Sequence, residues 1–295
     1  MSQADRQHRL GVVLIAAAAT AWSTAPFFTR LLHYDSWTIL FWRGLFGGGS
    51  IVLYLVLSQG RRGARDLVAM KASGWMVAAL STLGMVCFIP ALQLTNVANV
   101  AIIIAMQPFA AAGIAWLWLR EVPAARTMWA SLVALAGIAI IVSAAASIGD
   151  IRGVALALLM VLSLSVMTVM IRKHRDTSMV AAAAMSNFLG SLVSIAFARE
   201  IGAVGQSDLV TLALFGTFQV GLALPLFLVG SRFLPSGQAM LIATLETPLM
   251  PFWIWVAFHE VPSLRALAGG ALVLGAVIFD IVADNRVRAI PPAPS

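Results

Sequence analysis

Apolar segments fill most of this chain, and short polar joints separate them. Ten of these segments are about 20 residues long, the length that a helix needs to cross the hydrocarbon core of a bilayer. Lipid offers no partners to unpaired backbone groups, so segments of this length predict helices rather than strands. The predicted helices cover residues 10–30, 37–57, 74–94, 97–118, 126–146, 152–171, 178–198, 209–231, 236–258 and 264–283.

The pattern contains a repeat. Residues 116–126 read WLWLREVPAAR and residues 255–265 read WVAFHEVPSLR, with Trp, Glu, Val, Pro and Arg at the same relative positions. A constant offset of 139 residues relates the two copies. Five predicted helices in each copy is an odd number, so the second copy enters the membrane from the opposite face.

The sequence therefore predicts an all-α polytopic membrane protein with ten transmembrane helices, built as two inverted five-helix repeats. The first repeat covers residues 10–146, the second, inverted repeat covers 152–284, and a disordered tail follows at 285–295. Such an arrangement places a cavity near the membrane midplane, between the repeats. Prolines inside the predicted helices, such as Pro108 and Pro248, predict bending there and alternating access.

Composition and charge agree with a membrane protein. Hydrophobic residues make up 61% of the chain and charged residues only 11%, whereas about a quarter is usual in soluble proteins. The net charge of +7 does not indicate nucleic acid binding, because the basic residues lie in the joints. With both termini in the cytoplasm, fourteen basic residues lie on the cytoplasmic side and four outside, with Arg43 within a helix. This excess predicts cytoplasmic termini.

Several short motifs, in this order and spacing, resemble the EamA family of the drug/metabolite transporter superfamily. They are Ala21-Trp22-Ser23, Trp42-Arg43, Ala91 to Thr95, Pro108 to Glu121, Gly137, Leu245-Glu246-Thr247-Pro248 to Glu260, and Gly275. The resemblance covers both halves, and within the family the chain is most similar to the aromatic amino-acid exporters. It implies a ten-helix exporter of amino acids or other small metabolites in the bacterial cytoplasmic (inner) membrane, with no cofactor.

Polar residues at depth in the predicted helices are the candidates for substrate binding. Asn99 and Gln107 share one face of the fourth helix, and Gln238, Glu246 and Trp253 share one face of the ninth. Trp22 and Ser23 of the first helix complete the set. Glu246 is the only carboxylate at the centre of a predicted helix, which makes it a candidate for holding a substrate amino group or a proton. A neutral strut between the repeats explains it equally well.

Arg43 and the tryptophans have structural alternatives. Arg43 could bind a substrate carboxylate with two hydrogen bonds, but a structural role is favoured because the matching part of the other repeat offers no second charge. Trp22 and Trp253 could stack against an aromatic cargo, although packing explains them slightly better.

Other functional classes fit the sequence less well. The four histidines, His8, His33, His174 and His259, fall at a terminus or in joints, so no catalytic pairing and no metal site is expected within the helices. A sugar-phosphate or nucleotide-sugar carrier should place basic residues in the cavity, and a drug or organic-cation exporter of the same fold is the other alternative. The predicted partners are the lipid bilayer, a small-molecule substrate and protons.

Overall fold

The computed structural model describes residues 3–94, 97–142, 151–174, 178–259 and 261–289, and helices account for nearly all of them. No strand occurs within these ranges. The helices of the first half are α1 (Gln3–Trp22), α2 (Ala25–Leu31), α3 (Ser36–Gln59), α4 (Arg61–Val68), α5 (Ala72–Leu94), α6 (Val97–Ala105), α7 (Gln107–Leu119) and α8 (Ala125–Val142).

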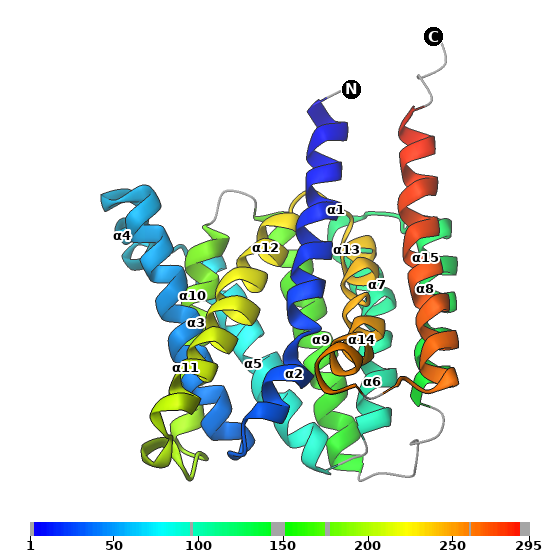
Figure 1. Ribbon diagram of the computed structural model, residues 1–295. Coiled ribbons are helices and arrows are strands. Elements are labelled where there is room, and N and C mark those ends of the chain that lie inside the picture. Colours follow the sequence, from blue (N-terminus) through cyan, green and yellow to red (C-terminus); the bar gives the residue numbers. More distant parts are fainter. Residues whose placement is uncertain (1–2, 95–96, 143–150, 175–177, 260, 290–295) are drawn as a thin grey trace.

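The second half has the same kind of architecture (Figure 1). Its elements are α9 (Ile151–Lys173), α10 (Met179–Ile195), the 3₁₀ helix η1 (Ile201–Ala203), α11 (Gln206–Phe215), the π-helix η2 (Gly216–Leu222), α12 (Ala223–Gly230), α13 (Ser236–Ala243), α14 (Glu246–Phe258) and α15 (Leu264–Ala289). In its described part, each of the ten predicted ranges coincides with one helix or with consecutive helices.

Six helical segments of the described residues are long and apolar enough to cross a membrane. They are Asp5–Leu31, Ser36–Gln59, Ile151–Lys173, Gln206–Gly230, Ser236–Phe258 and Leu264–Asp284. A seventh is obtained if Arg61–Val68 and Ala72–Phe88, which are bent by 74°, form one span, and two shorter apolar helices lie at Ala125–Ile141 and Met179–Ile195. The number of ten spans remains a prediction.

Two helices are broken at matching positions. α6 ends at Ala105 and α7 begins at Gln107, while α13 ends at Ala243 and α14 begins at Glu246. A proline in the first turn of α7 and of α14 lacks the N–H that would continue the preceding helix, which favours a break there. Both α7 and α14 contain 13 residues. Both also end at a left-handed residue with φ of 58°, Arg120 and His259, at the repeat offset.

Helices pack in pairs that relate the two halves. α3 packs on α10 and α8 on α15, so each lies against the element at the corresponding place in the other half. α7, the second part of one broken helix, packs on α13, the first part of the other. The pair α5 and α9 has its counterpart in α12 and α1. Glycines permit the closest of these approaches, because a Cβ on Gly137 in α8 would lie 2.6 Å from the carbonyl oxygen of Gly269 in α15.

The start of α1 and the end of α15 lie at the same end of the bundle (Figure 1). A contact confirms this, since His8 Nε2 in α1 is 2.6 Å from Asp284 Oδ2 in α15. We call this end the terminal side, and the other end the opposite side. The prediction that both ends of the helical region lie on one side therefore agrees with the fold.

Candidate functional site

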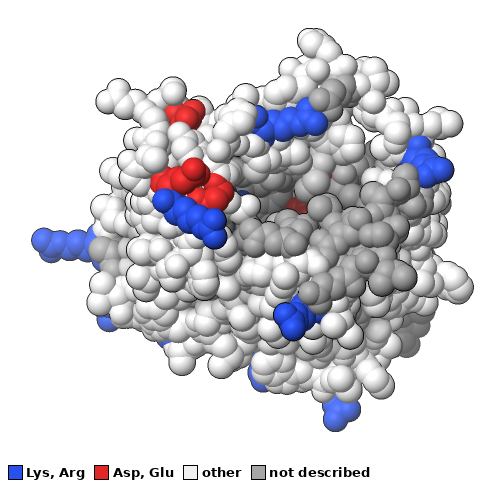
Figure 2. Space-filling view, turned by 90° about the horizontal axis from the view of Figure 1, so that it is seen from below, with Lys and Arg blue, Asp and Glu red and all other residues white. Residues whose placement is uncertain are grey.

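A cavity of about 300 Å³ lies at the centre of the bundle, where the broken helices meet. Figure 2, the view from the opposite side, shows that face hollowed at its centre, with acidic atoms at depth. Both halves of the chain line the cavity, with helices α1, α2, α3, α5, α6, α7 and α8 from the first and α9, η2, α12, α13 and α14 from the second. Two charged side chains, Arg43 and Glu246, are among the lining residues.

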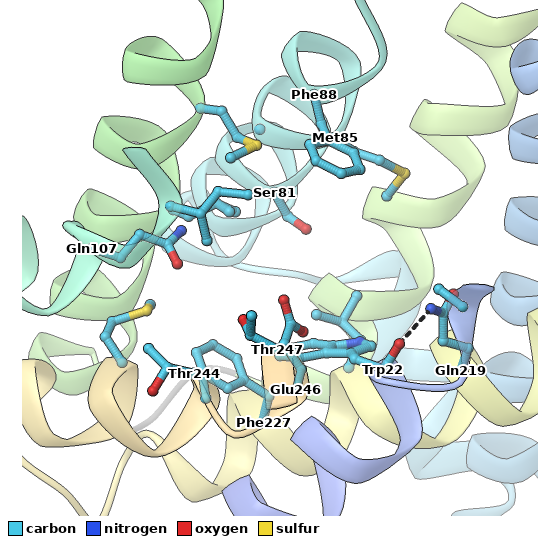
Figure 3. A pocket seen from close by; sticks show the side chains of 18 of the residues that line it. Trp22, Ser81, Met85, Phe88, Gln107, Gln219, Phe227, Thr244, Glu246 and Thr247 are labelled. Carbon is cyan, nitrogen blue, oxygen red and sulfur yellow. Dashed lines mark hydrogen bonds between the residues drawn. The ribbon is translucent and has the colours of Figure 1, made fainter. Parts of the chain in front are cut away.

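Arg43 is held by one amide and leaves other donors available. Its Nη1 donates to Oε1 of Gln219 at 2.8 Å, and Nε2 of Gln219 donates to the carbonyl oxygen of Trp22 at 3.1 Å (Figure 3). The guanidinium also lies 5.4 Å from the centre of the Phe215 ring. Arg43 Nε has no hydrogen-bond partner among the described residues. Because a guanidinium has five N–H donors, the group can still bind an anion.

Close packing of glycines brings Gln219 to this place. A Cβ on Gly216 in η2 would lie 2.5 Å from the carbonyl oxygen of Arg43, and one on Gly47 would lie 2.9 Å from the carbonyl oxygen of Gly216. α3 and η2 can therefore approach backbone to backbone. The π-helical turn, a feature frequent at functional sites, orients the buried Gln219 toward Arg43.

Glu246 is the first residue of α14 and projects into the cavity from the helix break (Figure 3). Within the part of the chain that the structure describes, no hydrogen bond or ion pair joins its carboxylate to another residue. The positive end of the α14 dipole favours a negative charge at this position. Thr244 and Thr247 lie beside it, and Gln107, the first residue of α7, faces it across the cavity.

Apolar side chains form the rest of the wall. The rings of Trp22 and Phe227 lie 5.2 Å apart, and Met85 and Phe88 of α5 face them across the cavity (Figure 3). Four more methionines contribute to the lining, Met160, Met167, Met240 and Met250. Methionine side chains adapt to irregular shapes, so this wall can accommodate apolar groups of different forms.

The structure brings four of the eight predicted site residues into one cavity, namely Trp22, Arg43, Gln107 and Glu246. Ser23 and Trp253 are joined to each other instead, since Trp253 Nε1 donates to Ser23 Oγ at 2.7 Å. Neither is among the residues that line the cavity. The side chain of Asn99 lies outside the described residues.

Gln238 lies in a second buried polar group near the terminal side, which we call the terminal-side cluster. It contains side chains from four helices: His8, Arg126, Thr127, Gln238, Asp280 and Asp284. The expectation that His8 lies in the terminus ahead of the first helix was wrong, because His8 lies inside α1 with 2% of its surface exposed. Helical packing of the first turns of α1 against α13 buries it.

Sequence reasoning missed the residues that complete the cavity. Gln219 was detectable as an isolated amide within an apolar segment, and its position in a predicted helix was the available signal. Ser81, Thr244 and Thr247 are small polar residues of a kind that occurs throughout this sequence, so no pattern set them apart.

Comparisons with known proteins agree with this architecture. The model of the EamA-like transporter family matches the chain twice, at residues 9–143 and 151–281. None of the curated proteins matches the chain significantly. A solved structure described only as the crystal structure of a protein is similar in fold, with a TM-score of 0.81 and 17% sequence identity over 95% of this chain and 99% of the other.

Proposed function

We propose that this chain, which belongs to the EamA-like transporter family and is a multi-pass membrane protein, exports small zwitterionic metabolites, above all neutral and aromatic amino acids. The observation that carries the proposal is the pairing of charges in one cavity. Arg43 offers free donors for a carboxylate, and Glu246 offers a carboxylate for an ammonium group. An amino acid carries both charges, on an ammonium group and a carboxylate attached to the same carbon atom.

The rest of the cavity supports the same class of cargo. Its volume of about 300 Å³ is at the small end of ligand sites. Trp22, Phe88 and Phe227 provide aromatic faces for an apolar side chain, and the methionines adapt to its shape. An aromatic amino acid would fill this space with its ring while its two charges meet Arg43 and Glu246.

Two alternatives are weaker on specific grounds. An organic cation would find Glu246 and aromatic rings in the cavity, but the cationic Arg43 would face it as well. A sugar phosphate would find one guanidinium, but also a carboxylate that repels its charge. Arg43 and Glu246 together favour a cargo of both signs.

Alternating access completes the proposal. Ten membrane spans form two inverted repeats over 10–146 and 152–284, and cytoplasmic termini place the opposite side outside the bacterial inner membrane. Two observations support the inverted relation. The packing of α5 on α9 is repeated by that of α12 on α1, and the helix breaks before Gln107 and Glu246 match. Impermeant thiol reagents should label Arg62→Cys and Ile151→Cys from different sides, whereas labelling from one side would contradict this topology.

Counterflow tests the cargo. Proteoliposomes loaded with an unlabelled neutral or aromatic amino acid should accumulate the labelled form. Excess of another neutral amino acid should compete with it, and the corresponding amine and the corresponding carboxylic acid should compete more weakly. Accumulation driven equally well by organic cations or sugar phosphates, with no response to amino acids, would overturn the proposed substrate class.

A further inference from the structure

The terminal-side cluster joins four helices through buried polar contacts. His8 Nε2 in α1 lies 2.6 Å from Asp284 Oδ2 and 3.1 Å from Gln238 Oε1. Gln238 Nε2 in α13 donates to Asp280 Oδ2 at 2.9 Å, and Thr127 in α8 donates to Asp280 Oδ1 at 2.7 Å. Arg126 of α8 pairs with the other oxygen of Asp284. Each contact crosses from one helix to another.

The hydrogen bonds fix where a proton lies. Because Gln238 uses its amide N–H toward Asp280, its Oε1 faces His8 as an acceptor. Asp284 Oδ2 is also an acceptor, so His8 Nε2 must carry the hydrogen that both contacts share. With both aspartates ionised, Arg126 balances one of the two negative charges. The charges of these six side chains then sum to zero when the ring of His8 takes up its second proton.

The cluster is buried deeply enough for its net charge to affect the stability of the helix arrangement. His8 and Asp284 are each 2% exposed, Gln238 is 1% exposed and Asp280 is fully buried. An uncompensated charge in such surroundings destabilises the arrangement that contains it. α12 and η2, which also pack against α1, contain no titratable side chain, and α14 contains only Glu246 at the cavity. Other charged residues near this end include Asp5, Arg6 and Arg9 of α1 and Arg232 after α12. Glu121, which pairs with Arg172, lies beside Arg126 and Gln238, and Arg286 and Arg288 follow Asp284 in α15.

Three of the four helices connect the cluster to the cavity, and α8 does so through Ile138, which lines the cavity. α1 carries His8 near its beginning and Trp22, which lines the cavity, at its end. α13 carries Gln238 in its first turn and leads directly to Thr244 and Glu246. Separation of α1 and α13 from α8 and α15 at the cluster would therefore open the terminal side of the cavity.

We propose that the terminal-side cluster is a proton-binding site, and that a proton held between His8 and Asp284 keeps the terminal side of the transporter closed. Loss of that proton leaves a net negative charge among Asp280, Asp284 and Arg126, which favours separation of α1 from α8 and α15. The device acts on one side only. At the repeat offset, Ile141 and Ala266 occupy the positions that correspond to Asp280 and Thr127.

Spin-label distances across the cluster test this proposal without any cargo, so their outcome is separate from that of the transport assay. Labels at Gln7→Cys in α1 and Ala125→Cys in α8 lie at exposed positions next to His8 and Arg126, in a Cys87→Ala background. As the pH rises from about 5 to about 8, the range in which histidine titrates, a longer distance between the two labels should become more populated. The population ratio should change by about 5- to 150-fold, the usual range for coupled equilibria.

Variants of His8 separate the proton from the packing. His8→Gln removes the charge, so the longer distance should dominate at both pH values. His8→Lys supplies a permanent cation, so the shorter distance should dominate at both. His33→Gln changes an exposed histidine of the opposite side and should retain the wild-type response. A pH-independent wild type, an increase of the longer distance at low pH, or an unchanged response in His8→Gln would each overturn the proposal.

Discussion

The central cavity and the terminal-side cluster both bring charged side chains into the interior of the bundle, but they treat those charges differently. In the cluster, carboxylates, guanidinium, amide and imidazole contact one another. In the cavity, Glu246 has no partner among the described residues, and Arg43 is bound by one amide. A buried charge without a partner is costly to the free energy of folding.

This difference indicates that the charges of the cluster stabilise the structure, whereas the charges of the cavity bind a cargo. Paired charges hold together the helices that carry them, since removal of one partner leaves the other buried without a counter-charge. Unpaired charges in a cavity keep their interactions for a ligand that supplies the complement. The comparison predicts that substitutions in the cluster affect stability most, and that substitutions in the cavity affect transport most.

The largest effect is expected for Asp280→Ala. The change removes the acceptor of Thr127 and Gln238 and leaves Arg126 with one carboxylate fewer. Breaking a buried charged network of this kind should lower the free energy of unfolding by about 3–5 kcal/mol. Denaturation in detergent measures the loss, with Asp66→Ala of α4 as the control. A loss equal to that of the control would show that the cluster does not lock the helices.

A smaller change in free energy is expected for Glu246→Gln and for Arg43→Gln, and it should appear in transport rather than in stability. Each removes one charged contact to the cargo, worth about 1.5–3 kcal/mol, so transport should fall by about 10- to 100-fold. The unfolding free energy should change little for Glu246→Gln, because no described partner is stranded. Glu200→Gln, outside the cavity, is the control. Wild-type transport by Glu246→Gln at every pH would identify Glu246 as a neutral strut.

The packing of α8 on α15, which supports the cluster, should tolerate substitution at one glycine and not at another. Gly137→Ala would place a methyl group 2.6 Å from the Gly269 carbonyl oxygen, whereas a Cβ on Gly275 meets nothing within 4 Å. Gly137→Ala should cost about 1–3 kcal/mol of stability, and Gly275→Ala should be neutral or slightly stabilising. Thermal unfolding of the two variants distinguishes them, and equal melting temperatures would contradict the packing.

The smallest effect concerns the opposite side, at the start of α3. Burial raises the pKa of Asp35, but hydrogen bonds from Thr38, Arg199 and Trp37 outweigh it and hold that pKa below the ordinary value of 3.8. A lowered carboxyl pKa stabilises the fold above its unfolded value and loses this contribution as the pH falls through the folded one. Asp35→Ala should therefore cost about 1 kcal/mol at pH 7, the usual worth of a helix cap.

The effect of Asp35→Ala should shrink below pH 3.8, where the wild-type carboxyl begins to lose its advantage. Thermal unfolding at neutral and at acidic pH measures this difference. Asp208→Asn, at another carboxylate on this side, serves as the comparison. A cost for Asp35→Ala that stays constant between the two pH values would show that the carboxylate is not the capping group.

The repeat and the breaks were predictable because they depend on local patterns. Proline after Gln107 and near Glu246 limits helical hydrogen bonds wherever it occurs, so the sequence located both breaks. The offset of 139 residues paired them correctly. Apolar length likewise located the helices, although it could not establish that all ten cross the membrane.

The division of polar residues between cavity and cluster was not predictable in the same way. In the predicted continuous helix, Gln238 and Glu246 share one face. In the structure, the break between α13 and α14 places them in different surroundings. His8 acquires its partners from α13 and α15, more than 200 residues away in the chain. Tertiary packing determines which polar side chain has a hydrogen-bonding or charged partner. The periodicity of the sequence does not predict these contacts.

The most direct test of the central claim is a binding measurement that crosses the cavity variants with trimmed ligands. Calorimetry would compare an amino acid, its amine without the carboxylate and its acid without the amino group. Wild-type protein should prefer the amino acid by about 10- to 100-fold over either analogue. Arg43→Gln should lose only the preference over the amine, and Glu246→Gln only the preference over the acid. Equal preferences in the wild type and both variants would contradict the assignment of the two charges.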